Sequence, residues 1–119
     1  MDLSAGYHQF PLADDGTREC LAVLSPFGQY LQNRMPFGPS GAPQHCQRVM
    51  TEEFGDLFDD GLGVYLDDLL AANKGWEAHI ALLTRVFRRM REKHLFLNAK
   101  KTNIAQQSVD FLGFTVDGR

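Results

Sequence analysis

Two adjacent carboxylates, Asp67 and Asp68, are the side chains of this sequence best suited to chemistry. They stand between two short apolar stretches, residues 62–66 and 69–72, whose alternation is typical of β-strands. This pattern predicts a tight hairpin with both acids at or beside its tip. Like charges held this close repel each other, so the arrangement costs stability unless a cation neutralises it.

Carboxylate oxygens are hard ligands that favour Mg²⁺ or Mn²⁺. Two such ions about 3.5–4 Å apart would stabilise the attacking and leaving oxygens of a phosphoryl transfer. A third acid, Asp2, precedes Asp67 by 65 positions, which excludes a local motif but suits neighbouring strands of one sheet. The alternative is an ordinary polar turn, because Asp is common in turns.

Composition indicates one globular unit. The chain has 119 residues, 44% hydrophobic and 23% charged, which suits a single domain with its own core. No apolar run approaches the length of a membrane span or a signal peptide, so we expect no membrane partner and an intracellular location. Cys20 and Cys46 lack the C-x-x-C spacing of zinc or redox sites.

Charge is divided unevenly along the sequence. The formal net charge is −3, but residues 1–73 carry −8 and residues 74–119 carry +5. A protein that binds nucleic acid through its general surface should be basic overall. Any nucleic-acid contact is therefore expected to be local, or shared with parts of a larger protein.

Short strands are expected in the first third of the chain. Asp2 and Leu3 resemble the end of a strand, and two extended stretches should form a hairpin around the turn at residues 14–16. A further strand should follow the Ser-Pro-Phe-Gly turn. The expected extended ranges are 8–13, 18–24 and 29–34.

Two helices dominate the remainder. Apolar residues at helical spacing predict helices over about 42–58 and 76–94, on either side of the acidic hairpin, with strands at 95–97 and 109–116. This order predicts an α+β fold in which two helices back an antiparallel sheet, leaving the other sheet face open to a nucleic-acid duplex. Basic residues between 85 and 93 could follow a phosphate backbone, although a solvated helix face is the simpler interpretation.

Five sequence blocks resemble the palm of reverse transcriptases, in particular those of gypsy-type long-terminal-repeat retrotransposons. Their order and spacing are family-like, and they extend from the first residue almost to the last. In chain order the blocks are Asp2-Leu3-Ser4-Ala5-Gly6-Tyr7-His8-Gln9, Leu24-Ser25-Pro26-Phe27-Gly28, Met35-Pro36-Phe37-Gly38, Val64-Tyr65-Leu66-Asp67-Asp68 and Val109-Asp110-Phe111-Leu112-Gly113.

The resemblance implies an RNA-directed DNA polymerase that joins deoxynucleotides to a primer 3′-hydroxyl. Residues 1–119 would be a single truncated domain: the palm with part of the fingers, at about 8–34, and without the thumb. Implied partners are an RNA or DNA template, a DNA or tRNA primer, dNTPs, and the fingers, thumb, RNase H and integrase segments of a Pol polyprotein. Two Mg²⁺ ions, or Mn²⁺, are the implied cofactors.

The resemblance also assigns the metal ligands. Asp2, Asp67 and Asp68 correspond to the catalytic carboxylates, and the backbone carbonyl of Leu3 would add a further oxygen. Such a polymerase needs no covalent nucleophile, since positioning and charge stabilisation supply the catalysis.

Nucleotide and primer contacts follow in the same way. Tyr7 resembles the steric gate that excludes a ribose 2′-hydroxyl, although it could equally be an aromatic at the edge of the core. Phe37 matches a position that contacts the incoming nucleotide, and Lys101, rather than Lys100, a lysine that approaches the triphosphate. The strand implied to contact the primer, which could otherwise be ordinary strand core, contains Phe111, Leu112 and Gly113.

Departures from the family pattern spare the three acids. Pro39 replaces a usual Leu, Leu31 a usual acid and Thr102 a usual Cys. Such changes would suit a retrotransposon copy that is accumulating mutations or has decayed. A second hypothesis is therefore a noncatalytic fragment that folds, or at most binds metal or nucleic acid. A third, another two-metal nucleotidyltransferase palm, leaves the Met-Pro-Phe-Gly block unexplained.

Overall fold

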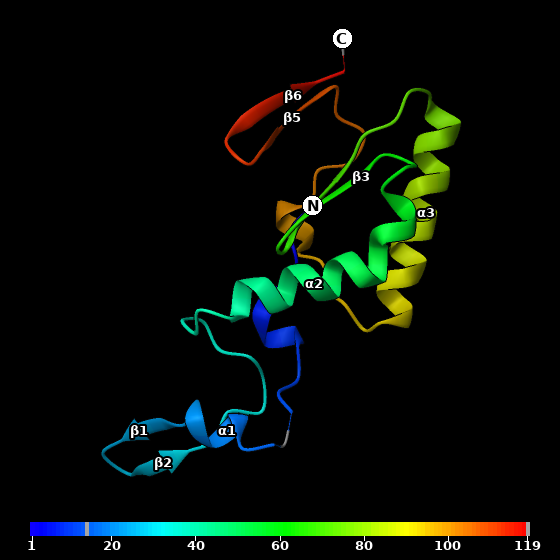
Figure 1. Ribbon diagram of the computed structural model, residues 1–119. Helices are drawn as coiled ribbons and strands as arrows, with labels where there is room; N and C mark the ends of the chain where they lie inside the picture. Colours follow the sequence, from blue (N-terminus) through cyan, green and yellow to red (C-terminus); the bar gives the residue numbers. More distant parts are fainter. Residues whose placement is uncertain (14, 119) are drawn as a thin grey trace.

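The protein is elongated, with a larger lobe built on two long helices and a smaller lobe carrying the first hairpin. A computed structural model describes residues 1–13 and 15–118 and measures 55 × 26 × 22 Å along its principal axes (Figure 1). The helices are α1 (Thr17–Cys20), α2 (Ala42–Phe54) and α3 (Trp76–Glu92), with 3₁₀ turns at Gly6–Gln9, Gly55–Leu57 and Ala99–Lys101. The strands are β1 (Val23–Ser25), β2 (Gly28–Tyr30), β3 (Leu62–Tyr65), β4 (Asp68–Ala71), β5 (Ser108–Phe111) and β6 (Phe114–Asp117).

Both long helices form where the apolar spacing predicts them. Pro43 is accommodated in the first turn of α2, where its missing N–H has no helical partner to lose. The buried face of α2 then repeats at intervals of four residues, and α3 has a matching stripe that ends at Met90. No helix among the described residues is long and apolar enough to cross a membrane.

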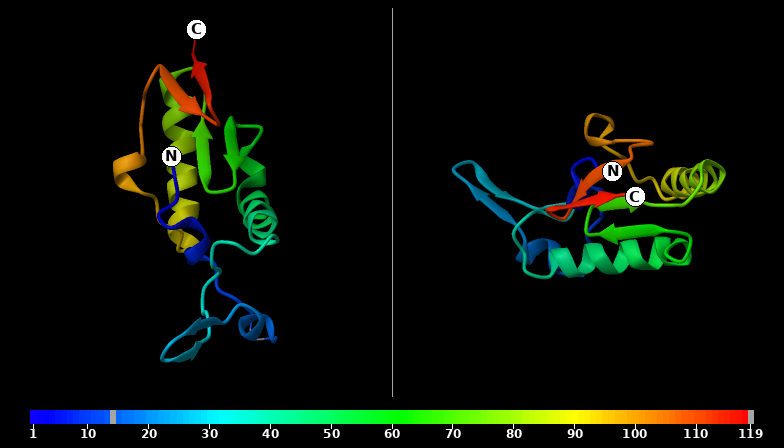
Figure 2. Two further views of the ribbon diagram at one scale, coloured as in Figure 1. Left: turned by 90° about the vertical axis from the view of Figure 1, so that its left-hand side faces the viewer. Right: turned by 90° about the horizontal axis from the view of Figure 1, so that it is seen from above.

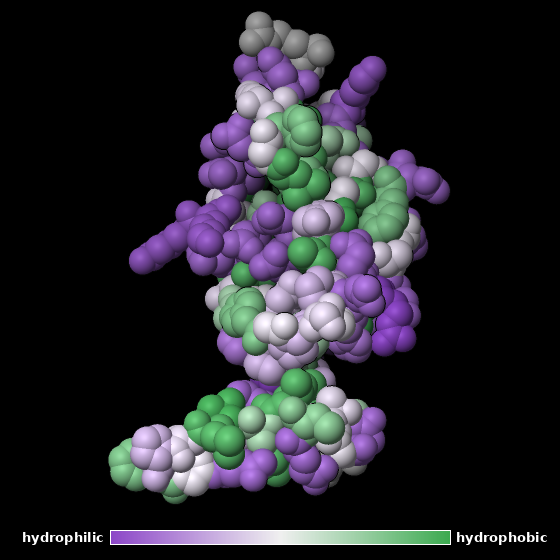
Figure 3. Space-filling model, turned by 60° about the vertical axis from the view of Figure 1, so that its left-hand side comes forward, coloured by the Kyte–Doolittle hydropathy of each residue, from purple (hydrophilic) through white to green (hydrophobic). Residues whose placement is uncertain are grey.

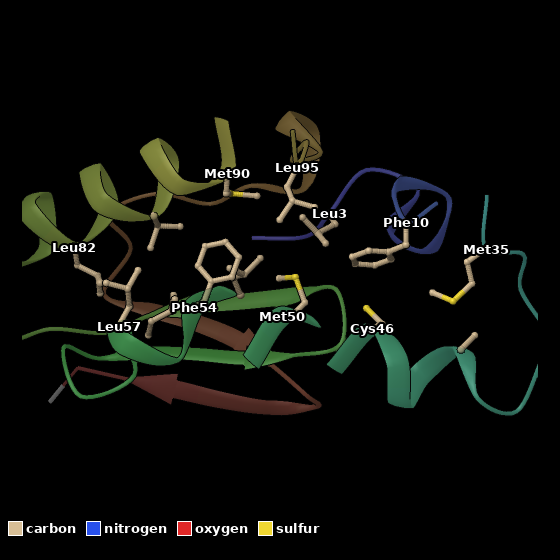
Figure 4. Packing of buried hydrophobic residues seen from close by; sticks show 14 residues of the cluster. Leu3, Phe10, Met35, Cys46, Met50, Phe54, Leu57, Leu82, Met90 and Leu95 are labelled. Carbon is tan, nitrogen blue, oxygen red and sulfur yellow. The ribbon is translucent and has the colours of Figure 1, made fainter. Parts of the chain in front are cut away.

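One hydrophobic cluster holds the helices against the acidic hairpin (Figure 4). The hairpin contributes Leu62 and Leu69, which are 3% and 1% exposed. Fully burying such a side chain stabilises the fold by about 1.5–3 kcal/mol, so the base of the hairpin is firmly anchored. The other members are Leu3, Phe10, Met35, Ala42, Cys46, Met50, Phe54, Leu57, Leu82, Val86, Met90 and Leu95.

The strands pair antiparallel, as expected, but in three separate two-stranded sheets rather than one continuous sheet. Single bridges extend the middle sheet, because Asp2 pairs with Asp68 and Leu3 pairs with Leu97. The first residues of the chain therefore lie between β4 and the segment that follows α3. Figure 2 shows this N-terminal segment beside the middle hairpin.

Part of the basic run on α3 pairs with acids at the end of α2. Lys93 Nζ lies 2.9 Å from Glu53 Oε2, and Arg89 forms a two-pronged contact with the carboxylate of Asp56. Exposed pairs of this kind add little to stability, because water and salt screen them. These residues connect two helices, so neither a free phosphate-binding stripe nor a purely solvated face describes the whole run.

Two of the expected extended stretches are wrong. Residues 8–13 begin inside the 3₁₀ turn Gly6–Gln9, and residues 18–24 begin inside α1. The Asp15 carboxylate accepts the Thr17 N–H at 3.2 Å, and such a contact favours a helical turn over a strand. Residue 14, in the predicted hairpin turn, lies outside the described residues.

Two further strand boundaries change. The strand expected over 29–34 is limited to Gly28–Tyr30, and the one expected over 109–116 is a complete hairpin, β5–β6. Its turn residues Leu112 and Gly113 have φ values of 53° and 79°. Two successive residues with positive φ reverse the chain in the sense that a twisted hairpin requires.

Apolar side chains of the smaller lobe are exposed, whereas the larger lobe contains the hydrophobic core. Leu24 is 80% exposed and Phe27 is 90% exposed, at and beside the turn between β1 and β2. Figure 3 shows apolar residues gathered on the surface of this lobe. Few buried contacts stabilise it, so its shape depends mainly on backbone pairing.

Candidate functional site

The acidic hairpin is as tight as the sequence predicts. Tyr65 pairs with Asp68, so Leu66 and Asp67 form a two-residue turn. Leu66 has a φ of 53°, a left-handed conformation that costs a residue with a Cβ about 1–2 kcal/mol. Leu66 therefore belongs to the turn and does not continue the alternation of β3.

Asp2 reaches this turn through backbone pairing. The Leu3 N–H donates to the Asp67 carbonyl at 2.9 Å, and the Leu69 N–H donates to the Met1 carbonyl at 2.8 Å. These bonds flank the bridge between Asp2 and Asp68. Directly paired residues project to the same face of a sheet, so the structure brings Asp2, Asp67 and Asp68 to one edge of the hairpin.

The surroundings of the hairpin alter the pKa of Asp68. Partial burial raises the pKa of Asp68, and the nearby charges of Asp2 and Asp67 raise it further. Burial, followed by the charge of Asp67, raises the pKa of the Cys46 thiol to about 11. Two positive charges oppose this rise in the pKa of Asp68, first the N-terminal ammonium and then Lys101, whose Nζ lies 3.2 Å from Asp2 Oδ2. Negative charge accumulates at the edge of the fold, where a cation would relieve it.

The donor set fits divalent metal ions in kind and in backbone placement. The backbones of Asp2, Asp67 and Asp68 lie together at one edge, and no described donor is bonded to the Leu3 carbonyl beside them. As the side chains stand, no group of three His, Cys, Asp or Glu residues among those described is close enough to hold a metal ion. The carboxylates of Asp2, Asp67 and Asp68 would therefore have to rotate toward one another on binding.

Tyr7 and Phe37 form an aromatic pair beside the turn. Their ring centroids are 5.1 Å apart, and the His8 ring meets Phe37 edge-on at 5.0 Å. Tyr7 is half-buried, and its pKa is raised by burial first and then by the charges of Cys46 and Asp67. Phe37 is 65% exposed, so one ring is anchored while the other faces solvent.

The predicted primer strand and the acidic hairpin line the same open cavity. This cavity of about 910 Å³ is lined by Asp2, Asp68 and Lys101 as well as by Phe111 and Leu112. Gly113, at the tip of β5–β6, has no atom within 4 Å of the position of an added Cβ. Of the two turn residues of β5–β6, only Leu112 lines the cavity with Asp2 and Asp68, and the aromatic pair Tyr7 and Phe37 is not among its lining residues.

Comparison with known families decides the identity. A family model described as "Reverse transcriptase (RNA-dependent DNA polymerase)" matches residues 1–116. The chain belongs to the reverse transcriptase family. It is 34% identical to the retrovirus-related Pol polyprotein from transposon 412 of Drosophila melanogaster, over 95% of this chain and 9% of the relative. It is 35% identical to the enzymatic polyprotein of Cestrum yellow leaf curling virus, over 98% of this chain and 18% of the relative.

A solved structure confirms the expected fold class. The foamy viral protease–reverse transcriptase dRH, in complex with double-stranded DNA, superposes with a TM-score of 0.89 at 25% identity. The match covers 98% of this chain and 20% of that one. This reverse transcriptase segment thus spans less than a fifth of the length of these curated relatives.

Two residues that hold the acidic turn of this reverse transcriptase segment were missed by the sequence analysis. A Cβ added to Gly6 would lie 2.8 Å from the Asp67 Cβ, so only glycine fits there without displacement. The Gln47 Oε1 accepts the Leu66 N–H at 2.7 Å. The sequence carries one signal for this contact, since Gln47 directly follows a residue of the buried stripe of α2.

Proposed function

We propose that residues 1–119 are the palm, with finger hairpins at about 8–34, of an RNA-directed DNA polymerase from a gypsy-type retrotransposon. The reaction is transfer of a deoxynucleotide to a primer 3′-hydroxyl on an RNA or DNA template. The observation that carries the proposal is the bridge between Asp2 and Asp68, which joins acids from distant parts of the chain at one hairpin tip.

The carboxylates of Asp2, Asp67 and Asp68, with the Leu3 carbonyl, would hold two Mg²⁺ ions. When bound, the ions would activate the primer hydroxyl and neutralise charge on the α-phosphate as pyrophosphate leaves. The contribution of the chain itself is to fix acids on two strands whose backbones are hydrogen-bonded, so that little reorganisation is needed during the reaction.

Tyr7, Phe37 and Lys101 are proposed to bind the incoming nucleotide. The Tyr7 ring is packed against Phe37, and the 3₁₀ turn that carries it is closed by the His8 N–H donating to the Ala5 carbonyl at 2.9 Å. A ring held this firmly would exclude a 2′-hydroxyl by contact. Lys101 is 67% exposed, so its ammonium group has room to leave Asp2 for a triphosphate.

Phe111, Leu112 and Gly113 are proposed to contact the primer. They form the tip of β5–β6, and Phe111 and Leu112 line the same cavity as Asp2 and Asp68. The open space around Gly113 permits close approach of a second backbone. A primer end lying between the two hairpins would present its 3′-hydroxyl toward Asp2 and Asp68.

Template-primed incorporation of dNTPs tests the proposal. The assay uses a polymerase-length protein that carries residues 1–119 with flanking polymerase regions, and it compares added Mg²⁺ with chelator. Asp2→Asn should abolish incorporation, whereas Asp59→Asn, a matched change at an exposed acid remote from the turn, should leave it intact. Metal-independent incorporation, or full activity of Asp2→Asn, would contradict the mechanism. No incorporation by the unaltered protein would favour the noncatalytic alternative.

A further inference from the structure

We infer that Gln47 is a positioning residue, which fixes the Leu66–Asp67 turn and thereby sets the placement of the catalytic carboxylates. The inference rests on the proposed function, since it assigns a role to Gln47 in the same reaction. Gln47 lies on α2 and has no direct contact with the three acids among the described hydrogen bonds. It acts through the backbone of the turn.

The side-chain amide of Gln47 contacts both sides of Tyr65. Its Oε1 accepts the Leu66 N–H at 2.7 Å, and its Nε2 lies 3.4 Å from the Val64 carbonyl. The Nε2 also donates to Thr51 Oγ1 at 3.3 Å, one helical turn further along α2. These contacts orient the amide so that its oxygen faces the turn.

The turn needs an external acceptor at this position. Leu66 follows the last ladder pair, Tyr65 with Asp68, so its N–H has no partner in the opposite strand. Its positive φ is unfavourable for a leucine, and tertiary contacts must hold it there. A hydrogen bond from a neighbouring helix supplies such a contact.

The helix that carries Gln47 is rigidly placed. Cys46 and Met50, on either side of Gln47 along α2, are fully buried. On the opposite side of the turn, the Leu3 N–H donates to the Asp67 carbonyl. The two turn residues are thus held from α2 and from the N-terminal segment, and these two elements are fixed by the same core.

Loss of the Gln47 contact should affect chemistry more than nucleotide binding. The proposed nucleotide residues Tyr7 and Phe37 pack against each other and have no described hydrogen bond to Gln47. A turn that departs from its geometry displaces Asp67 and Asp68 relative to Asp2. Small displacements of catalytic groups reduce turnover strongly, because the reaction depends on alignment.

The test compares Gln47→Met, which keeps the size of the side chain but removes the acceptor, with Gln47→Glu, which keeps an acceptor. In the polymerase-length protein, Gln47→Met should lower kcat by about 10- to 100-fold, as is usual when a supporting contact to metal ligands is lost. The KM for dNTP should change by less than about threefold, because ground-state binding is retained. Gln47→Glu should restore most of kcat.

Two measurements besides activity complete the test. Amide exchange at Leu66 should be at least about tenfold faster in Gln47→Met than in the unaltered protein, because the protecting acceptor is gone. Mn²⁺ affinity should fall by about tenfold. Gln44→Met, a matched change at an exposed position one turn earlier on α2, should leave exchange, affinity and kcat unchanged.

The outcomes separate the inference from the proposed function. An active unaltered protein in which Gln47→Met and Gln44→Met have equal kcat and equal Leu66 exchange would overturn the inference alone. An unaltered protein with no Mg²⁺-dependent incorporation would overturn the proposed function and, with it, the role assigned to Gln47.

Discussion

The hairpins β3–β4 and β5–β6 share a local design but have different surroundings. Each has four residues per strand and a two-residue turn, and each turn begins with a leucine, Leu66 or Leu112, at a φ of 53°. The second turn residue is Asp67 in one hairpin and Gly113 in the other. The two turns differ in backbone only at this second residue, because φ is positive at Gly113 but not at Asp67.

The two hairpins differ in their tertiary contacts. The turn of β3–β4 is bonded to Leu3 and Gln47 and lies against Gly6, and its strands bury Leu62 and Leu69. No residue of β5 or β6 is buried, and an added Cβ at Gly113 would meet nothing within 4 Å. The proposed metal-binding acids therefore lie on the hairpin whose geometry is fixed by the hydrophobic core. The hairpin proposed to contact the primer remains exposed.

The largest expected difference between the hairpins is catalytic. Asp67→Asn or Asp68→Asn should reduce dNTP incorporation by at least about 1000-fold, because each removes charge from a proposed metal site. Asp110→Asn, in β5, should change it by less than about threefold, since Asn can still accept the Thr115 hydroxyl bonded at 2.9 Å. Steady-state incorporation by the polymerase-length protein measures both. Comparable losses in the two hairpins would remove the functional distinction between them.

Adding one methyl group should disturb the acidic turn more than the exposed one. Gly6→Ala places a Cβ against Asp67 and should lower the free energy of unfolding by about 1–3 kcal/mol, the usual cost of overpacking. Gly113→Ala meets no neighbour and should cost only the strain of its positive φ, about 1 kcal/mol. Urea denaturation compares the variants. Only Gly6→Ala should also weaken Mn²⁺ binding. Lower Mn²⁺ affinity in Gly113→Ala would contradict the proposed difference between the two hairpins.

The charge on the acidic hairpin should carry a stability cost that depends on pH. The pKa of Asp68 is raised above its ordinary value of 3.8 in the folded state, so the fold binds this proton more tightly than the unfolded chain does. Stability should therefore fall as pH rises from about 3.8 through the raised pKa, and remain lower at neutral pH.

Asp68→Asn should remove that cost. Without divalent metal, the variant should be more stable than the unaltered chain at neutral pH, by less than the Gly6 effect, and the difference should vanish below about pH 3.8. Thermal unfolding across pH measures it. A gain of the same size in acid would show that charge is not its cause.

The smallest effect should come from improving the exposed turn. Leu112→Asn creates an Asn-Gly turn, the preferred sequence for two successive positive φ values, and should stabilise the chain by about 0.5 kcal/mol. Leu66→Asn should give no such gain, because the half-buried Leu66 would be replaced by a polar residue and the next residue, Asp67, does not have a positive φ. The urea midpoint distinguishes the two. Equal gains would mean that the surroundings of β3–β4 contribute little.

Periodicity was sufficient to predict the acidic hairpin and both long helices. The alternation around Asp67 and the apolar spacing on α2 and α3 are strong local signals, and the structure confirms all three elements. The approach of Asp2 to Asp68 could be expected only through a sheet shared by distant strands, and the family resemblance supplied the reason to pair them.

The missed features depend on contacts that a local pattern does not contain. The helix at Thr17–Cys20 and the 3₁₀ turn at Gly6–Gln9 are four residues long, so single hydrogen bonds outweigh strand propensity there. The contact of Gln47 joins residues 19 positions apart, and its partner is a backbone N–H, so the only signal in the sequence is the position of Gln47 beside the buried stripe of α2. The prediction of one continuous strand over 109–116 was wrong because Leu112, as well as Gly113, adopts a positive φ and reverses the chain.

The pairing of the first residues with β4 also sets the order of folding events. A hairpin such as β3–β4 closes within about 1–10 μs, since its partners are adjacent in sequence. Met1 and Leu69 are 68 positions apart, so their contact has to wait for closure of nearly the whole chain between them. A locally opened molecule could thus keep the hairpin that carries Asp67 and Asp68 while Asp2 is detached from it. The proposed catalytic arrangement would therefore be completed late in folding, when this long-range contact forms.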